Sequence, residues 1–317
     1  MTASILEIKK VGKRFGSKKV LQSIDLTLPQ GESVALLGPN GGGKTTLLRL
    51  CSGLLGPSEG EILFKGVPLK KSRKTLIRET GYFPEFPSLY DQLTVWENLL
   101  FFGRLKGLSA ARIRETCELY LVRLNLMDCL KQKTFSLSKG TKYKISLCRA
   151  FMGDPRILFM DEPATGLAPE VVEFFTEILK ERKKKGLTLI YTSHNMDMTT
   201  EISDRIVLIN RTVAAMGTIA EFSEQYFTPR WRLRAEEITG EMIDRIKAVG
   251  GIRILHSSED ILIYERTDSV KEQNDILKIL MNNGCRILSL VRDRHTAGEI
   301  YKAVFSQTEE ENHANLE

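Results

Sequence analysis

The sequence predicts an α/β domain with a mainly parallel sheet, followed by a small α+β domain, from three observations. Short apolar, β-branched runs alternate with longer amphipathic segments up to about residue 220, as in strand–helix–strand units. Two of these runs end in polar segments that strand packing does not require: a glycine-rich loop and a pair of carboxylates. After residue 222 a second, shorter alternation of strand and helix patterns begins.

The composition indicates a soluble protein with a sizeable core. The 317 residues suffice for one large or two ordinary domains, and the chain is 42% apolar and 27% charged. No apolar run approaches the roughly 18 residues that span a bilayer, and the N-terminus lacks the apolar run of a signal peptide. We therefore expect a cytoplasmic chain without a membrane span of its own.

Cysteine usage and charge disfavour a disulfide-rich protein, a cysteine metal site and a nucleic-acid-binding protein. The five cysteines are scattered and show no C-x-x-C pair, so we expect reduced, mostly buried thiols. The net charge is +6, and the lysine-rich segments 70–74 and 180–186 are typical of solvated helix ends. Because no aromatic side chains are interleaved with these lysines, no nucleic-acid partner is expected.

Residues 1–222 are predicted to form one domain with seven apolar strands. In order, these are ILEIKKV, SIDLTL, SVALLG, GEILF, ILFMD, TLIYTS and RIVLI. The closely spaced strands near the N-terminus are expected to pair antiparallel. Between about residues 90 and 153, apolar residues recur every three to four positions, which predicts a helical insertion within this domain.

The remaining residues predict a second domain. Residues 223–232 contain a proline and mixed aromatics and are expected to be a linker. Residues 233–307 follow the order βαββαβ, which favours a small ferredoxin-like or related α+β domain without a catalytic cluster. The polar segment 308–317 is expected to be disordered.

A glycine-rich loop, GPNGGGKTT at residues 38–46, directly follows the predicted strand SVALL and opens a helix. It matches the phosphate-loop pattern G-x-x-x-x-G-K-[ST], in which glycines let backbone N–H groups approach phosphate oxygens. The dipole of the following helix adds to this attraction. Lys44 is expected to reach the β- and γ-phosphates, and the Thr45 hydroxyl to bind Mg²⁺. The predicted nucleotide-binding residues of the loop are Gly38, Asn40, Gly41, Gly42, Gly43, Lys44, Thr45 and Thr46.

Two adjacent carboxylates, Asp161 and Glu162, follow the apolar run ILFM. Burying an unpartnered carboxylate is unfavourable, so a cation is expected here, and Mg²⁺ usually arrives with phosphates. Asp161 is predicted to bind Mg²⁺ directly or through water, and Glu162 to polarise the water that attacks the γ-phosphate. The alternative is a surface acidic turn, which the apolar strand disfavours.

A third segment, LSKGTKYKISLCRAF at residues 137–151, completes a resemblance. With the phosphate loop and the acidic pair in order, residues 1 to about 222 resemble the ATP-binding subunit of ABC transporters. LSKGT is similar to that family's LSGGQ signature, which closes over the ATP held by the opposing subunit. The resemblance implies that Ser138, Lys139 and Gly140 contact the opposing ATP. An ordinary helix N-cap is the alternative.

Three further residues take their roles from this resemblance. Phe15 matches the aromatic that stacks on adenine, although tyrosine is commoner there and a core phenylalanine is the alternative. His194, in YTSHNMD, matches the switch histidine that contacts the γ-phosphate. Glu85 stands where the family usually has glutamine and keeps an oxygen ligand for Mg²⁺ or water. The implied catalytic residues are Glu162, His194 and Glu85, and the implied Mg²⁺ ligands are Thr45, Asp161 and Glu85.

The resemblance also implies a fold, an activity and partners. The fold is that of a P-loop NTPase ABC cassette, with a RecA-like α/β core, an antiparallel β subdomain and a helical insertion. The activity is hydrolysis of ATP with Mg²⁺, which drives transport through closure of a cassette dimer. Export is the favoured direction, and a homodimer is the favoured assembly. Separate permease subunits would hold the chain at the inner face of the cell membrane.

Departures from the family pattern leave a second hypothesis open. Lys139 and Thr141 replace a glycine and the glutamine of the signature, and Ala168 stands where aspartate is usual. The chain could be a regulatory or asymmetric ATP-binding cassette with weak hydrolysis that needs a different partner cassette. Translation-associated and chromosome ATPases are disfavoured, because the chain has one phosphate loop and a compact insertion. The C-terminal domain is expected to regulate or stabilise dimerisation.

Overall fold

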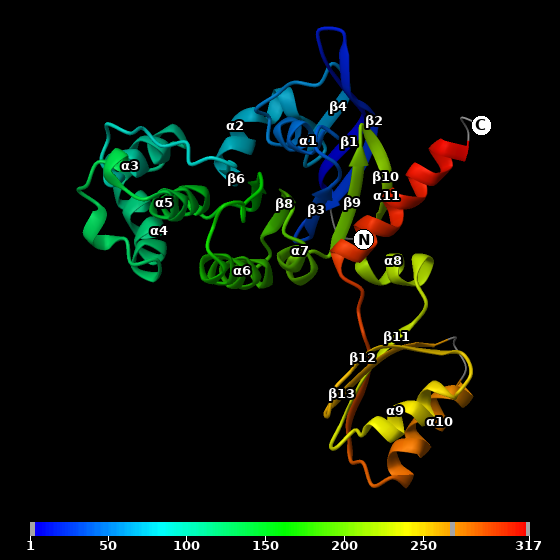
Figure 1. Ribbon diagram of the computed structural model, residues 1–317. Helices are drawn as coiled ribbons and strands as arrows, with labels where there is room; N and C mark the ends of the chain where they lie inside the picture. Colours follow the sequence, from blue (N-terminus) through cyan, green and yellow to red (C-terminus); the bar gives the residue numbers. More distant parts are fainter. Residues whose placement is uncertain (1–3, 267–269, 315–317) are drawn as a thin grey trace. The chain divides into compact units, whose positions relative to one another are not determined.

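The structure, a computed structural model, describes residues 4–266 and 270–314 of the chain. The chain divides into two compact units, residues 1–216 and 217–317 (Figure 1). The first unit contains β1–β10 and α1–α7, and the second contains α8–α11 and β11–β14. Within the described residues, no helix is both long and apolar enough to cross a bilayer.

The central sheet of the first unit has the strand order β10-β9-β3-β8-β7-β6. The neighbours from β9 to β6 pair in parallel. Every residue of β3, β7 and β8 is buried, as in parallel strands covered on both faces. Because parallel strands end at one edge, the loop after β3 and the carboxylates after β7 meet there. The bounds are β3 Ser33–Leu37, β6 Thr80–Phe83, β7 Ile157–Met160, β8 Thr188–Thr192, β9 Arg205–Asn210 and β10 Thr212–Gly217.

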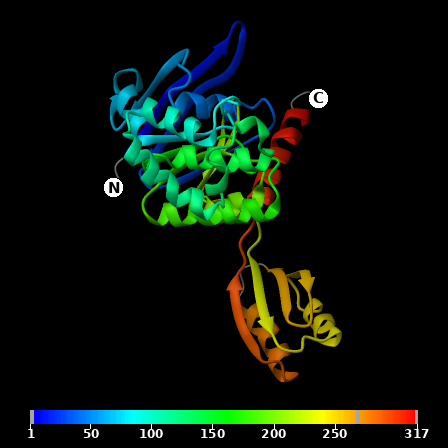
Figure 2. The ribbon, with the colours of Figure 1, turned by 90° about the vertical axis from the view of Figure 1, so that its left-hand side faces the viewer.

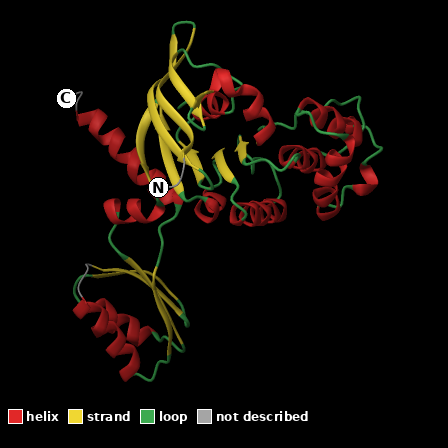
Figure 3. Ribbon diagram, turned by 180° about the vertical axis from the view of Figure 1, so that it is seen from behind, coloured by secondary structure: helices red, strands yellow, loops and turns green. Residues whose placement is uncertain are grey.

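A second, antiparallel sheet has the order β2-β1-β4-β5 and confirms the predicted pairing of the N-terminal strands. Helix α1 (Lys44–Cys51) packs against both β2 and β8, and its leucines join the core that the two sheets share. Helices α6 (Pro169–Lys184) and α7 (Met196–Ile202) lie side by side (Figures 1 and 3). The remaining bounds are β1 Ser4–Phe15, β2 Lys18–Pro29, β4 Glu59–Phe64, β5 Val67–Pro68 and α2 Leu69–Glu79.

The helical insertion lies within the predicted range 90–153 (Figure 2). It contains α3 (Val95–Leu105), α4 (Ala110–Arg123) and α5 (Lys139–Phe151), with short 3₁₀ turns η1 (Met127–Cys129) and η2 (Thr134–Ser136). A capping box between Thr94 and Glu97 starts α3, because each side chain accepts a hydrogen bond from the other's backbone. Helix α5 packs on β6 and thereby joins the insertion to the central sheet.

The second unit contains the predicted βαββαβ arrangement. Its antiparallel sheet has the order β12-β13-β11-β14, and Figure 3 shows α9 and α10 on one face of it. Helices α8 and α11 pack against each other. The bounds are α8 Ile219–Tyr226, β11 Arg230–Ala235, α9 Gly240–Lys247, β12 Ile252–Ser257, β13 Ile261–Arg266, α10 Val270–Asn282, β14 Ile287–Arg292 and α11 Ala297–Ala314.

Several elements differ from the sequence-based expectation. Strands β5, β6 and β10 were not expected: β5 has only two residues, β6 begins with Thr80 and Gly81 and so lacks an apolar run like that of β7, and β10 is mostly exposed or half-buried. The expected linker 223–232 is reduced to residues 227–229, because Thr218 and Glu221 cap a helix that runs to Tyr226 and β11 begins at Arg230. Helix α11 continues to Ala314, into the segment expected to be disordered. All five cysteine side chains are buried, with no disulfide in the described residues.

Candidate functional site

The glycine-rich loop joins β3 to α1, and its conformation depends on glycine. Gly43 precedes α1 with φ 102°, in the left-handed region that side chains disfavour. A Cβ atom at Gly43 would lie 2.5 Å from Cδ2 of Leu21, so only glycine fits. No side chain therefore covers the backbone at Gly43, directly before α1, which allows phosphate oxygens to approach closely.

Lys44, the first residue of α1, folds back over this loop. Its Nζ donates to the carbonyl oxygen of Gly38 at 2.8 Å and to that of Pro39 at 3.2 Å. Burial lowers the pKa of Lys44, while the carboxylates of Glu162 and Asp161 act in the opposite direction. A cation thus lies between the loop and the acidic pair.

The carboxylate of Asp161 is 1% exposed and follows the end of β7. Its Oδ1 accepts hydrogen bonds from the hydroxyls of Thr45 and Thr192, both at 2.8 Å. Nη2 of Arg49 lies 3.9 Å from Oδ2. The structure therefore brings together two of the predicted Mg²⁺ ligands, Thr45 and Asp161, and adds Thr192, which the sequence did not indicate.

Glu162 is held by its backbone and by one carboxylate oxygen. It has φ 48°, which is uncommon for a residue with a side chain, and its N–H donates to the hydroxyl of Thr192 at 2.9 Å. Oε2 accepts the backbone N–H of His194 at 2.9 Å, and Oε1 lies 3.4 Å from Nε2 of that histidine. Burial raises the pKa of Glu162, although His194 and Lys44 oppose the shift.

One pocket collects most of the predicted residues from segments far apart in the sequence. Glu85, Glu162 and His194 line it opposite residues of the phosphate loop. Lys18 and Val20 of β2, together with Thr165, also line the pocket and were not predicted. Thr165 follows the acidic pair closely in the sequence and could have been found from it, whereas Lys18 and Val20 belong to no sequence motif. The full lining is Lys18, Val20, Asn40, Gly41, Gly42, Gly43, Lys44, Thr45, Thr46, Glu85, Glu162, Thr165 and His194.

Phe15 and the signature residues do not line this pocket. Phe15 ends β1 with its ring 51% exposed and with Nζ of Lys13 at 5.2 Å from the ring centroid. Ser138 caps α5 by accepting the N–H of Thr141 at 3.1 Å, so the ordinary capping role is present in the chain. The ammonium of Lys139 lies 5.8 Å from the ring centroid of Tyr143 in the same helix.

Comparison with known proteins identifies the family. Residues 21–165 match the family model described as ABC transporter. Over 271 residues, covering 85% of this chain and 86% of the relative, the chain is 31% identical to the uncharacterized ABC transporter ATP-binding protein YhaQ of Bacillus subtilis. It is 34% identical to the linearmycin resistance ATP-binding protein LnrL of Bacillus subtilis, over 68% of this chain and 69% of LnrL. It is 36% identical to the Nod factor export ATP-binding protein I of Paraburkholderia xenovorans, over 66% of this chain and 69% of that relative.

Solved structures confirm the predicted fold class. An ATP-binding subunit of an ABC transporter matches with TM-score 0.66 and 31% identity, over 70% of this chain and 93% of that one. The cbiO1 protein of Clostridium perfringens matches with TM-score 0.61 and 27% identity, over 70% of this chain and 92% of cbiO1. The dimeric cassette MJ0796 bound to ADP and Pi shares the fold, with TM-score 0.61 and 23% identity, over 67% of this chain and 98% of MJ0796. The chain therefore belongs to the ATP-binding proteins of ABC transporters, a family that binds ATP and hydrolyses it to power transport.

Proposed function

We propose that this chain powers an exporter, and that ATP drives closure of two cassettes against separate membrane subunits. The observation that carries the proposal is that residues of the phosphate loop line one pocket together with Glu162 and His194. Two relatives are named for export of Nod factor and for linearmycin resistance. The cbiO1 structure is described as part of the ABC transporter complex cbiONQ, which supports an assembly of several subunits.

In this proposal the phosphate loop and the start of α1 hold the phosphates of ATP. Backbone N–H groups at a helix N-terminus attract anions, and Lys44 adds a full positive charge. The half-exposed ring of Phe15 at the end of β1 is available to stack on adenine. Lys18 and Val20 extend the pocket along β2.

The oxygen ligands at the pocket fit Mg²⁺. Thr45 and Glu85 line the pocket, and the buried Asp161 carboxylate lies directly behind Thr45, whose hydroxyl donates to it at 2.8 Å. No group of three or more His, Cys, Asp or Glu side chains in the described ranges forms a metal cluster of its own. The ion would therefore complete its shell with phosphate oxygens and water, as Mg²⁺ prefers, and when bound it would neutralise phosphate charge.

Glu162 is proposed to be the general base for the attacking water. One carboxylate oxygen is anchored by the His194 N–H, which fixes the orientation of the group. Burial raises the pKa of Glu162, which makes it a better proton acceptor than an exposed glutamate. A positioned base of this kind contributes about 10²- to 10⁴-fold to the rate. His194 would contact the γ-phosphate from the same edge.

Dimer closure is proposed to bring Ser138, Lys139 and Gly140 of one chain onto the ATP of another. These residues start α5, whose N-terminus attracts phosphate, and Lys139 adds a cation. The MJ0796 structure with the same fold is dimeric. We further propose that the accessory domain, predicted as residues 233–307, regulates or stabilises this dimer.

A regulatory or asymmetric cassette is the second candidate, and a missing side-chain contact at Ala168 favours it. Ala168 is the N-cap residue of α6 and makes no side-chain capping bond there, whereas an aspartate could accept one. The usual polar side chain is therefore missing at a position that follows the acidic pair. In this second candidate, the chain binds ATP but turns it over slowly and pairs with a different cassette.

A small exposed aromatic patch supports docking to a membrane subunit. It consists of Tyr90 and Phe101, which are 51% and 38% exposed and whose ring centroids lie 4.9 Å apart. Contiguous exposed apolar residues mark interaction surfaces. We propose that a permease subunit docks on this patch and holds the chain at the inner face of the cell membrane.

Hydrolysis by the purified chain tests the proposal. With Mg²⁺ and ATP the wild-type chain is expected to release phosphate, and Glu162→Gln to release it at least about 100-fold more slowly. Glu61→Gln, which changes an exposed glutamate on β4, is the matched control and should retain the wild-type rate. ATP binding without hydrolysis by the wild type would favour the asymmetric cassette.

A further inference from the structure

Side chains of α5 hold the loop that carries Glu85. The hydroxyl of Tyr143 donates to the carbonyl oxygen of Glu85, and the guanidinium of Arg149 donates to that of Ser88. The ammonium of Lys142 lies 3.1 Å from the carboxylate of Asp91. Three contacts from one helix therefore span the loop from Glu85 to Asp91, between the end of β6 and the start of α3.

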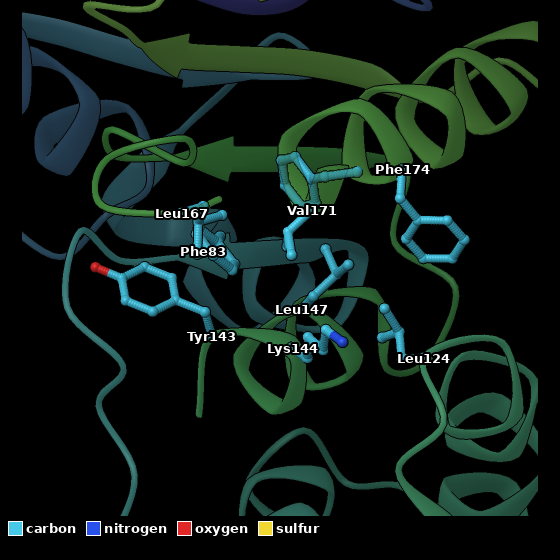
Figure 4. Close-up of a pocket in the computed structure, with 9 residues that line it drawn as sticks. Phe83, Leu124, Tyr143, Lys144, Leu147, Leu167, Val171 and Phe174 are labelled. Carbon is cyan, nitrogen blue, oxygen red and sulfur yellow. The ribbon is translucent and has the colours of Figure 1, made fainter. Parts of the chain in front are cut away.

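Tyr143 lies where this helix meets the central sheet. Its side chain is 2% exposed, and its ring centroid is 6.1 Å from that of Phe83, the last residue of β6. In Figure 4 its ring lies beside Phe83 and Leu167, and the hydroxyl points away from the apolar side chains. The ring is thus fixed by packing, and the hydroxyl is left for the Glu85 carbonyl.

The hydroxyl remains a donor at physiological pH. Burial raises the pKa of Tyr143, and the nearby Glu85 acts in the same direction. The phenol is therefore neutral, and a neutral phenol can donate one hydrogen bond to a carbonyl oxygen. Removing that donor leaves the carbonyl without this partner but does not change the packing of the ring.

We propose that Tyr143 is a positioning residue, which makes the place of Glu85 in the nucleotide pocket depend on the position of the signature helix α5. The inference rests on the proposed function, because it assigns Glu85 to the hydrolytic site. The Tyr143 hydroxyl holds the Glu85 carbonyl, and its ring is fixed on Phe83 of the central sheet, so the backbone that carries the Glu85 side chain into the pocket is anchored at this point.

A double-mutant cycle on ATP hydrolysis tests this role. Tyr143→Phe keeps the ring and removes the hydroxyl, and kcat is expected to fall about fivefold to tenfold with an unchanged Kd for ATP. In a Glu85→Ala background, the same substitution should change kcat less than about twofold, because its effect passes through Glu85. Equal losses in both backgrounds, or no loss in either, would overturn the proposal. A purely structural effect of Tyr143 would appear in both backgrounds.

A second measurement separates this inference from the proposed function. Amide hydrogen exchange in residues 84–91 of the full-length chain should be about fivefold faster or more in Tyr143→Phe than in wild type. Tyr191→Phe is the matched control, because it also removes a buried hydroxyl that hydrogen bonds, here to Ser203 at 2.6 Å. Unchanged exchange in Tyr143→Phe would refute the positioning role even in a chain that hydrolyses ATP. If exchange is faster in Tyr143→Phe but the wild-type chain does not hydrolyse ATP, the positioning role of Tyr143 holds and the proposed function is refuted instead.

Discussion

The hydroxyl of Thr192 lies 2.8 Å from Oδ1 of Asp161, and it accepts the backbone N–H of Glu162 at 2.9 Å. One fully buried side chain at the end of β8 thus holds both members of the acidic pair at the end of β7. The Thr45 hydroxyl donates to the same Oδ1 from α1. Three elements of the cassette therefore meet at one carboxylate oxygen.

Replacing Thr192 should impair hydrolysis more than ATP binding. Thr192→Val keeps the shape of the side chain but removes the donor to Asp161 and the acceptor for Glu162, so both carboxylates become less well fixed. We expect kcat to fall about tenfold, which corresponds to the loss of about 1.4 kcal/mol, and the Kd for ATP to change little. Steady-state hydrolysis and equilibrium ATP binding give the two values.

Thr176→Val is the matched control for this substitution. Thr176 is also buried, and its hydroxyl donates to the carbonyl oxygen of Val172 within α6, away from the acidic pair. The control should retain hydrolysis within about twofold. A Thr192→Val protein with the wild-type kcat would show that the Asp161 and Glu162 positions do not depend on this hydroxyl.

Local motifs made much of the site predictable. The phosphate loop, Asp161 and Glu162 each lie at the end of an apolar strand, so sequence neighbours define their geometry. Thr192 could not be assigned in the same way, because its partners lie about 30 residues away and meet it only through the pairing of β7 with β8. The contact of Tyr143 with Glu85 likewise depends on how α5 packs on β6.

The strand pattern was predictable where burial is continuous. Strands β3, β7 and β8 are buried at every position and therefore read as unbroken apolar runs. Strand β6 is as short as β7 but begins with Thr80 and Gly81, so it lacks the unbroken apolar run that marks β7. Its place at the sheet edge is defined by tertiary pairing with β7.

Hydrolysis should depend on pH through Glu162. Its pKa is raised by burial, so the carboxylate takes up a proton at a higher pH than an exposed glutamate and then cannot accept one from water. We expect kcat to fall as the pH decreases, with a midpoint above 4.5, the ordinary value for glutamate. A pH profile of kcat, limited to the range in which circular dichroism shows a folded chain, gives this midpoint.

The residual rate of Glu162→Gln over the same range is the control, and it should lack this titration. If wild type and variant fell in parallel as the pH decreased, a different group would be responsible. A wild-type rate that stayed constant through pH 4.5 would contradict a raised pKa for the base.

Stability of the second unit should also depend on pH, through His295. The ring is 2% exposed and stacks on Phe227 at a centroid distance of 4.1 Å. Neither ring nitrogen has a hydrogen-bond partner within the described residues. Burial lowers the pKa of His295, and Arg230 acts in the same direction, whereas the acidic residues Glu299, Glu265 and Asp293 oppose the shift.

The sign of this dependence follows from proton binding. Because the folded pKa lies below the ordinary 6.5, the unfolded chain binds more protons as the pH falls through 6.5. The stabilisation is complete above that pH and is lost progressively below it. Thermal unfolding should therefore give a lower Tm for the second unit at pH 5.5 than at pH 7.5. His295→Phe should reduce this difference, and His256→Gln, at an exposed position, should not; equal pH dependence in all three proteins would contradict the assignment.

ATP-driven dimer closure is the central claim, and the mass of Glu162→Gln in solution tests it most directly. Removing the base should trap ATP between two chains if each signature engages the opposing nucleotide. Light scattering after size exclusion should then give twice the monomer mass with ATP and the monomer mass without it. A monomer that still binds ATP would contradict closure of two copies of this chain and favour a cassette that needs a different partner.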